Sequence, residues 1–197
     1  MTSSTARSCE PRFPAPGVLL DNSVLVRLWK CQVLEALQGT VELHVAQQVS
    51  AEFRKQGPSE RAAFDRLGAQ SHRVGPGTPF WSAFSRLRGA RYNTRDLGDD
   101  ELLAIAVTWA DDGVRLPIVT YDAGAAKDAL AEGLVAIDFL DTLAWLVGCG
   151  RLTADQANEV ERRAQLLEGY RRSTSYSGQI DHVYEARQAE LVTRVRR

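Results

Sequence analysis

The stretch that decides the fold spans residues 96–122 and reads DLGDDELLAIAVTWADDGVRLPIVTYD. It predicts a helix that begins at an acidic turn, followed by a loop and a short apolar strand. One buried helix face is indicated by apolar residues at helical spacing: Leu102, Ile105, Ala106 and Trp109. The expected strand, residues 116–121, delivers Asp122 at its carboxyl end, which is the edge where open α/β sheets form their sites.

The rest of the chain alternates apolar runs with helical patterns. Residues 17–20 form an apolar run that Asp21 follows directly, and residues 41–45 and 134–137 are further expected strands. Helices are expected over residues 23–37, 47–56, 59–67, 80–87, 123–132, 139–146 and 153–167. Strands that alternate with helices, without a hairpin signal, predict the α/β class: a three-layer α/β/α sandwich with a short, mainly parallel sheet.

The sequence divides into three predicted regions. Residues 1–16 read as a loose leader, residues 17–148 as the α/β domain, and residues 149–197 as a C-terminal helical extension. Within the extension, residues 180–195 carry an apolar stripe at helical spacing. Because an isolated helix of this length is marginal in water, we expect it to dock on its own domain or on the second subunit of a homodimer.

The composition argues against several classes of protein. No run approaches the roughly 18 apolar residues of a membrane span, and the N-terminus lacks the apolar segment of a signal peptide. Cys9, Cys31 and Cys149 are too few and too scattered for a disulfide framework or a zinc site. We therefore expect no membrane association and a reducing, cytoplasmic setting.

Charge is distributed unevenly, although the net charge is only −1. Residues 54–95 contain nine Lys or Arg against two acids, and residues 96–141 contain eleven acids against two basic residues. A basic segment beside an acidic one is what a metal-dependent enzyme with a polyanionic substrate requires. Two solvated helix faces of opposite sign would give the same counts.

Acidic residues from several segments are candidates for one shared site. Asp21 and Asp122 each follow an apolar strand, Glu52 lies on an early helix, and Asp100 and Glu101 stand at the start of the central helix. Carboxylates gathered at one edge repel each other unless a divalent ion holds them, and oxygen ligands suit Mg²⁺ or Mn²⁺. The alternatives are that Asp21 and Asp122 cap the helices that follow them, and that Glu52 is a surface acid.

The order of these acids along the chain resembles the PIN domain. That family consists of metal-dependent ribonucleases and includes the toxin of many bacterial toxin–antitoxin pairs. The matching pieces are LLDNSVLVRL (19–28), VAQQVSAEF (45–53), LGDDELLAIAV (97–107) and PIVTYDAGAAKDAL (117–130). All of them lie within the predicted PIN-like nuclease domain, residues 17–148.

The resemblance implies a fold, a chemistry and a set of site residues. The catalytic, metal-binding acids would be Asp21, Glu52, Glu101 and Asp122. The implied cofactor is Mg²⁺ or Mn²⁺, the implied substrate is RNA, and the toxin members of the family have an antitoxin protein as partner. Ser23 and Thr120 match the small hydroxyl residues that often flank these acids.

The chain departs from the family pattern at the central helix. There Asp99, Asp100 and Glu101 stand together in place of a single acid. Consecutive helix residues point in different directions, so only one or two of these acids reach the site. Ile105 lies one turn beyond Glu101, which favours Glu101; Asp100 stays open as a metal ligand, and Asp99 is expected to be a cap.

The sequence therefore predicts a Mg²⁺- or Mn²⁺-dependent endoribonuclease. Candidates for contacts with backbone phosphates are Arg54, Lys55, Arg86, Arg88, Arg91 and Arg95. A phosphate-monoester hydrolase would need Asp-x-Asp after the first strand, whereas this chain has Asp21-Asn22-Ser23. The alternative left open is a catalytically silent PIN-like module that binds RNA or a partner protein.

Overall fold

The computed structural model of the chain describes residues 15–90, 97–168 and 180–195. Expectations for residues 1–14, for residues 169–179, and for Arg91 and Arg95 lie outside the described residues. Five parallel strands form one sheet in the order β3-β2-β1-β4-β5. They are β1 (Gly17–Leu20), β2 (Glu42–Ala46), β3 (Gln70–His72), β4 (Ile118–Val119) and β5 (Ala136–Ile137).

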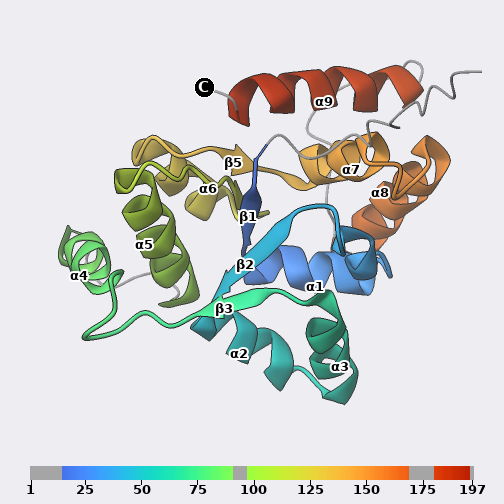
Figure 1. The fold of residues 1–197 in the computed structure, drawn as a ribbon. Coiled ribbons are helices and arrows are strands. Elements are labelled where there is room, and N and C mark those ends of the chain that lie inside the picture. The colour runs from blue at the N-terminus through green and yellow to red at the C-terminus, as the bar shows by residue number, and fades with distance from the viewer. Residues whose placement is uncertain (1–14, 91–96, 169–179, 196–197) are drawn as a thin grey trace, which may run out of the picture.

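Helices cover both faces of this sheet. They are α1 (Asn22–Lys30), α2 (Gln47–Lys55), α3 (Pro58–Leu67), α4 (Trp81–Ala90), α5 (Leu97–Asp111), α6 (Ala123–Ala131), α7 (Phe139–Gly148), α8 (Ala154–Glu168) and α9 (Ile180–Val195). Figure 1 shows α4, α5 and α6 on one side of the strands and α1, α7 and α8 on the other. The predicted α/β class with a mainly parallel sheet is confirmed, and the described sheet is parallel throughout.

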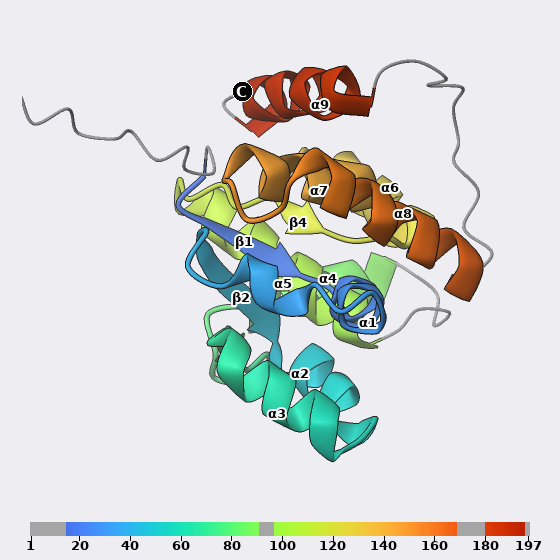
Figure 2. The ribbon, with the colours of Figure 1, turned by 90° about the vertical axis from the view of Figure 1, so that its right-hand side faces the viewer.

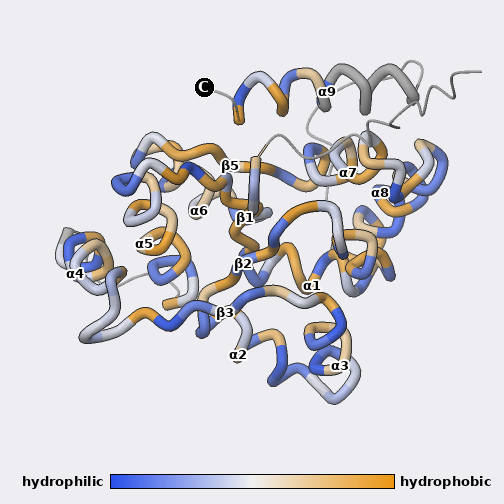
Figure 3. Tube along the Cα trace, viewed as in Figure 1, coloured by the Kyte–Doolittle hydropathy of each residue, from blue (hydrophilic) through white to orange (hydrophobic). Residues whose placement is uncertain are grey.

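The core lies where strand β1 runs through the middle of the sheet. All four residues of β1 are buried, because helices lie over both of its faces. Leu19 pairs with His44 of β2 on one side and with Ile118 of β4 on the other. Figure 3 shows hydrophobic stretches along the strands and the helices next to them. Within the described parts of the chain, no helix has the length and apolar character that crossing a membrane requires.

Helix α5 is more deeply buried than the sequence pattern predicts. Every residue from 100 to 107 is buried, whereas Trp109, expected on the buried face, is only half-buried. The reason is that α5 packs against β1, β2 and α2 and also against α4. The predicted burial of Leu102, Ile105 and Ala106 is therefore confirmed, but the other faces of the helix are buried too, and Asp100 and Glu101 are buried with them.

The helix expected over residues 23–37 is also wrong as one continuous element. Helix α1 ends at Lys30, and Gln32 takes a left-handed backbone conformation with φ of 62°. A 3₁₀ turn, Leu34–Leu37, follows. Leu34 and Leu37 are still buried, so the apolar spacing is correct although the chain changes direction.

Helix α9 docks on its own chain, which is one of the two placements expected for it. It packs against α7 and α8, and Leu191 is only 1% exposed. Figure 2 shows α9 as an outer layer above α7 and α8. Of the apolar stripe read from the sequence, Leu191 and Val195 have described side chains, and both pack against the domain.

Candidate active site

The candidate site lies where the strand order reverses. From β1 the chain moves to β2 and β3 on one side, and then returns to β4 and β5 on the other. The carboxyl ends of β1 and β4 flank this switch point, which is the preferred ligand site of open α/β sheets. Asp21 follows β1 and Thr120 follows β4, so both residues stand at this point.

Asp21 is held by donors from both strand ends. Its Oδ2 accepts hydrogen bonds from the hydroxyls of Ser23 and Thr120, the latter at 2.9 Å. Its Oδ1 accepts from the backbone N–H of Asn22, as befits the N-cap of α1. Only 4% of Asp21 is exposed. Asp21 therefore both caps α1 and lies beside Ser23 and Thr120, and these hydrogen bonds fix the orientation of its carboxylate.

Glu52 and Glu101 are linked to Asp21 through Asn22 and Gln48, each of which uses both its backbone N–H and its side-chain amide. Asn22 Nδ2 lies 3.4 Å from Glu52 Oε2, and Gln48 Nε2 donates to Glu52 Oε1 at 2.8 Å. The backbone N–H of Gln48 donates to Glu101 Oε2 at 3.2 Å. A continuous run of polar contacts thus links Asp21, on the first strand end, to Glu101 on α5.

Glu101 has a perturbed acidity in this setting. Burial raises the pKa of Glu101, and the nearby Glu52 carboxylate raises it further, while the hydrogen bond from Gln48 partly offsets both effects. Two carboxylates near each other in a buried place form a site that a cation would stabilise.

Asp100 is buried beside Glu101 but faces a different neighbour. It is 3% exposed, and Arg88 Nη1 of α4 lies 3.5 Å from its Oδ2. Its Oδ1 is buried and has no hydrogen-bond partner. Asp99, the expected cap, is half-buried. Asp100 and Glu101, the two candidate ligands of the central helix, are therefore both buried, and Asp100 has one oxygen without a hydrogen-bond partner among the described residues.

Asp122 serves the helix that follows it. It is exposed, and its Oδ1 accepts from the backbone N–H of Ala125 at 2.8 Å, which makes it the N-cap of α6. Its own backbone N–H donates to Thr120 Oγ1 at 3.1 Å. The Asp122 carboxylate thus acts as a helix cap, which was one of the two roles considered for it. Asp122 is connected to Asp21 only indirectly, because its backbone N–H donates to Thr120, whose hydroxyl donates to Asp21.

The oxygen atoms of the site suit Mg²⁺ or Mn²⁺ in kind. Two buried side-chain oxygens here, Asn22 Oδ1 and Asp100 Oδ1, have no hydrogen-bond partner among the residues that the structure describes. Carboxylate and amide oxygens are the donors that these ions prefer. Among the described residues, however, no group of three or more His, Cys, Asp or Glu side chains is arranged to hold a metal ion. The donor atoms are of the kind that such an ion prefers, but the described acids do not lie close enough together to coordinate one.

Most of the described basic candidates already face an acid of this chain. Arg54 pairs with Asp65 at 2.6 Å, and Arg86 pairs with Glu132 at 3.4 Å. Arg88 faces Asp100, as described above. Lys55 is exposed. Exposed ion pairs contribute little stability, so these pairs hold Arg54 and Arg86 only weakly.

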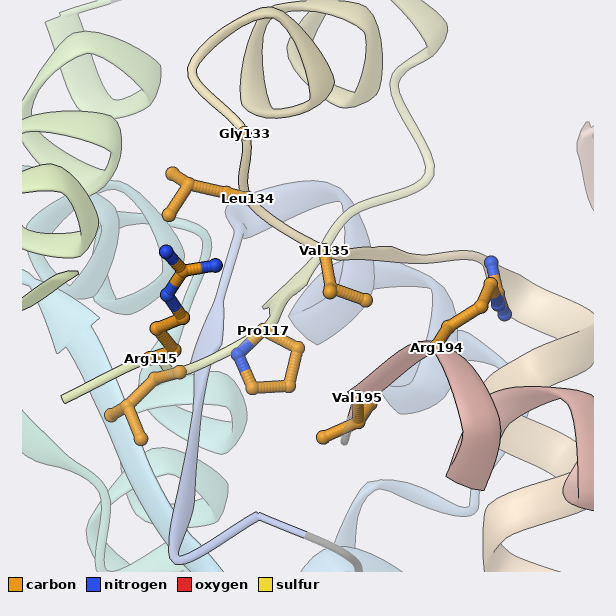
Figure 4. Close-up of a pocket in the computed structure, with 8 residues that line it drawn as sticks. Arg115, Pro117, Gly133, Leu134, Val135, Arg194 and Val195 are labelled. Carbon is orange, nitrogen blue, oxygen red and sulfur yellow. The ribbon is translucent and has the colours of Figure 1, made fainter. Parts of the chain in front are cut away.

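A cavity of about 270 Å³ lies away from these acids, at the opposite edge of the sheet. Arg115 and Pro117 line it just before β4, Val135 lines it before β5, and Val195 lines it from the end of α9, as Figure 4 shows. Because the candidate acids follow the strands rather than precede them, this cavity is not part of the candidate site.

Sequence reasoning missed Gln48 and Asn22, which hold Glu52 in place. Amide residues carry no signal of their own in a single sequence, and these became visible only through their contacts. A scan against protein-family models finds no match for this chain, and searches of curated proteins and of solved structures find no significant match. A function is therefore argued from the geometry of the site.

Proposed function

We propose that this chain is a Mg²⁺- or Mn²⁺-dependent endoribonuclease with a PIN-like fold. The observation that supports this most is the run of contacts from Asp21 through Asn22, Glu52 and Gln48 to Glu101. It links Asp21, at the carboxyl end of β1 beside the switch point of the parallel sheet, to Glu52 on α2 and Glu101 on α5. Acids gathered in this way are costly unless they bind a cation.

The proposed roles follow from the surroundings of each acid. Asp21 is the anchoring ligand, because Ser23 and Thr120 fix its orientation. Glu52 and Glu101 complete the ligand set, and Asp100 stays an additional ligand. A bound divalent ion would activate water and stabilise charge on the phosphodiester.

The raised pKa of Glu101 also fits a ligand role. A divalent ion beside its carboxylate would favour the ionised form that burial and Glu52 disfavour. The role of Asp122 is smaller in this proposal, since its carboxylate is engaged by Ala125. RNA as substrate and an antitoxin as partner are supported by the sequence resemblance alone.

The alternative function is a catalytically silent module that binds RNA or a partner protein. Two observations favour it: the described acids are not closed around an ion, and Asp122 acts as a helix cap. The two functions differ in what the acids do, so removing one acid charge at a time separates them.

The experiment compares wild type with Asp21→Asn and, as the matched control, Asp99→Asn. Each purified protein is incubated with labelled RNA and Mn²⁺, and its fold is checked by circular dichroism. We expect Asp21→Asn to abolish cleavage while it remains folded, and Asp99→Asn to cleave nearly as wild type does. Cleavage by Asp21→Asn at the wild-type rate would overturn the nuclease proposal.

A further inference from the structure

Helix α4 begins with a tryptophan at the surface of the protein. Trp81 is 39% exposed, whereas every other aromatic side chain that the structure describes is buried or half-buried. Phe80 and Phe84, its neighbours along the chain, are both buried. A single apolar residue at the surface is ordinary, so the position of Trp81 is informative only if its surroundings point to a partner.

Aromatic and basic side chains lie beside Trp81 on one face of α4. The Trp81 ring stacks on Phe84, with 5.5 Å between the ring centres and 26° between the ring planes. The guanidinium carbon of Arg88 lies 5.7 Å from the centre of the Phe84 ring. Residues 81, 84 and 88 are spaced i, i+3 and i+7, which places them on one helix face together with the exposed Ser85. We call Trp81, Phe84, Ser85 and Arg88 the α4 stripe.

The first residue of the α4 stripe is held in place by the loop before it. The Gly75 backbone N–H donates to Thr78 Oγ1 at 3.2 Å, and the Thr78 hydroxyl donates to the Gly75 carbonyl at 2.8 Å. The backbone N–H of Trp81 donates to the Thr78 carbonyl at 3.2 Å. Phe80 packs edge-on against Trp109 of α5. Because the start of the helix is already ordered, binding a flat partner on the indole costs little conformational entropy.

Positive charge accompanies the aromatic rings of this helix. Helix α4 lies at the outside of the molecule, beside α5 (Figure 1), and it carries two arginines and no acid. Arg86 is exposed and pairs with Glu132 only at 3.4 Å, so this pair holds it weakly. Arg88 lies 3.5 Å from Asp100, one residue before Glu101 near the start of α5. Aromatic surface and positive charge therefore occur together, next to the helix that carries one acid of the proposed site.

We propose that the α4 stripe is a stacking platform for an unpaired base of single-stranded RNA. Every base has a flat π face that can stack on an exposed indole, and the phosphates that flank the base attract guanidinium groups. A base within a duplex is already paired and stacked, so the platform selects single strands over double-stranded RNA. The choice of RNA rests on the proposed function, which this inference deepens. Trp81 binds the strand and takes no part in the chemistry.

The test measures the affinity for a fluorescently labelled single-stranded RNA by anisotropy, in EDTA so that no metal-dependent cleavage occurs. Full-length wild type is compared with Trp81→Leu, which keeps an apolar side chain without a π face, and with Trp81→Phe, which keeps a ring. Trp81→Leu should weaken binding about tenfold, whereas Trp81→Phe should stay within about threefold of wild type. The matched control is Leu166→Ala, which removes an exposed apolar side chain from α8 and should leave the affinity unchanged.

Three further readouts separate stacking from charge and from a structural role. Wild type should bind the same RNA more weakly as a duplex, and Trp81→Leu should lose most of this preference. The salt dependence of binding should be the same in wild type and Trp81→Leu, because a neutral side chain releases no counterions. Single-stranded RNA should quench the tryptophan fluorescence of wild type but not that of Trp81→Phe. This last readout does not depend on how well Trp81→Leu folds.

The outcomes separate this inference from the function on which it rests. Equal affinity of wild type and Trp81→Leu, with cleavage that still requires Asp21, overturns the platform alone. Weaker binding by Trp81→Leu, with no cleavage by wild type, supports the platform and overturns the nuclease proposal. Unchanged RNA affinity with a lower solution mass of Trp81→Leu would assign the α4 stripe to contact with a second copy and so overturn the inference. If wild type binds no single-stranded RNA, the platform fails.

Discussion

Thr120 donates its hydroxyl to Asp21 Oδ2 at 2.9 Å and so joins two residues that are 99 positions apart in the chain. The hydroxyl oxygen of Thr120, Oγ1, also accepts a hydrogen bond from the backbone N–H of Asp122 at 3.1 Å. Thr120 therefore ties the ends of β1 and β4 together at the switch point, and it connects the two acids that follow these strands.

Replacing Thr120 with Val removes this link while it keeps the shape of the side chain. Asp21 loses one of its donors, and the Asp122 N–H loses its acceptor. We expect unfolding free energy to fall by about 2 kcal/mol, as for other hydrogen bonds to buried charged groups. Mn²⁺-dependent cleavage should fall roughly 10- to 100-fold, because residues that orient metal ligands have effects of this size. Urea denaturation and cleavage rates measure the two effects.

Thr108→Val is the matched control for this substitution. The Thr108 hydroxyl donates to Ala104 O within α5 and faces no acid of the site. This variant should retain wild-type cleavage. If Thr120→Val and Thr108→Val behave alike in both assays, Thr120 has no special role at the site.

The raised pKa of Glu101 predicts a pH dependence of stability. Because this pKa is higher in the folded than in the unfolded chain, ionisation of Glu101 opposes folding. Its contribution is therefore fully present below the unfolded pKa, about 4.3, and is lost as pH rises through the folded value. Glu101→Gln should be more stable than wild type at pH 7, and this difference should disappear near pH 4.

Glu52→Gln gives an independent check on the cause. Glu52 contributes to the raised pKa of Glu101, so this variant should move the loss of stability to lower pH. Urea unfolding across the range of pH 4 to 7 measures both variants. A stability difference between wild type and Glu101→Gln that does not change with pH would contradict the prediction.

The sequence predicted the sheet and the position of Asp21 because both depend on local pattern. An apolar run followed by an acid fixes a strand and its end, and the order of such runs indicates a parallel sheet. The same reasoning predicted that α9 docks either on its own domain or on a second subunit, since an apolar stripe must be covered, and the structure shows the first of these.

The finer arrangement depends on contacts between distant segments, which one sequence does not reveal. The spacing of Glu101 and Ile105 gave no sign that α4 would cover the other side of α5 and bring Arg88 to Asp100. Likewise, Asp21 and Asp122 look identical in sequence. Only the structure shows that Asp21, besides capping α1, accepts hydrogen bonds from the Ser23 and Thr120 hydroxyls, whereas the Asp122 carboxylate caps α6.

Two histidines on adjacent strands should make the stability of the fold fall at acidic pH. His44 Nδ1 lies 3.1 Å from His72 Nε2, and both rings pack edge-on against Trp109. Burial lowers the pKa of both histidines, and the neighbouring ring lowers that of His44 further. The stability that the neutral rings provide is present above the unfolded pKa, about 6.5, and is lost as pH falls through the folded values.

Replacing His72 with Gln tests this prediction. Gln keeps a polar partner for His44 Nδ1 but removes one of the titrating groups. We expect the fall in stability between about pH 7 and pH 5 to be shallower in the variant than in wild type. Unfolding by urea at a series of pH values measures the slope, and equal slopes in the two proteins would refute the assignment.

Helix α9 should be anchored electrostatically as well as by apolar packing. Asp141 of α7 is 1% exposed, and Arg187 and Arg194 of α9 both donate to its carboxylate. Arg187→Ala leaves this buried acid with one cation fewer, which should lower the unfolding free energy by roughly 3 kcal/mol. Combining it with Asp141→Asn removes the buried carboxylate that Arg194 alone then balances, and should recover part of that loss.

Arg162→Ala serves as the control, because Arg162 of α8 pairs with Glu159 on the same exposed helix surface and should matter little. Deleting residues 173–197 uncovers the face of α7 that Leu191 helps to bury and should also lower the melting temperature. The anchoring role requires a double variant more stable than Arg187→Ala alone, since only then does the cost arise from the buried charge of Asp141. Additive losses from Arg187→Ala and Asp141→Asn, together with an unchanged melting temperature after the deletion, would show that α9 is not held to the domain in this way.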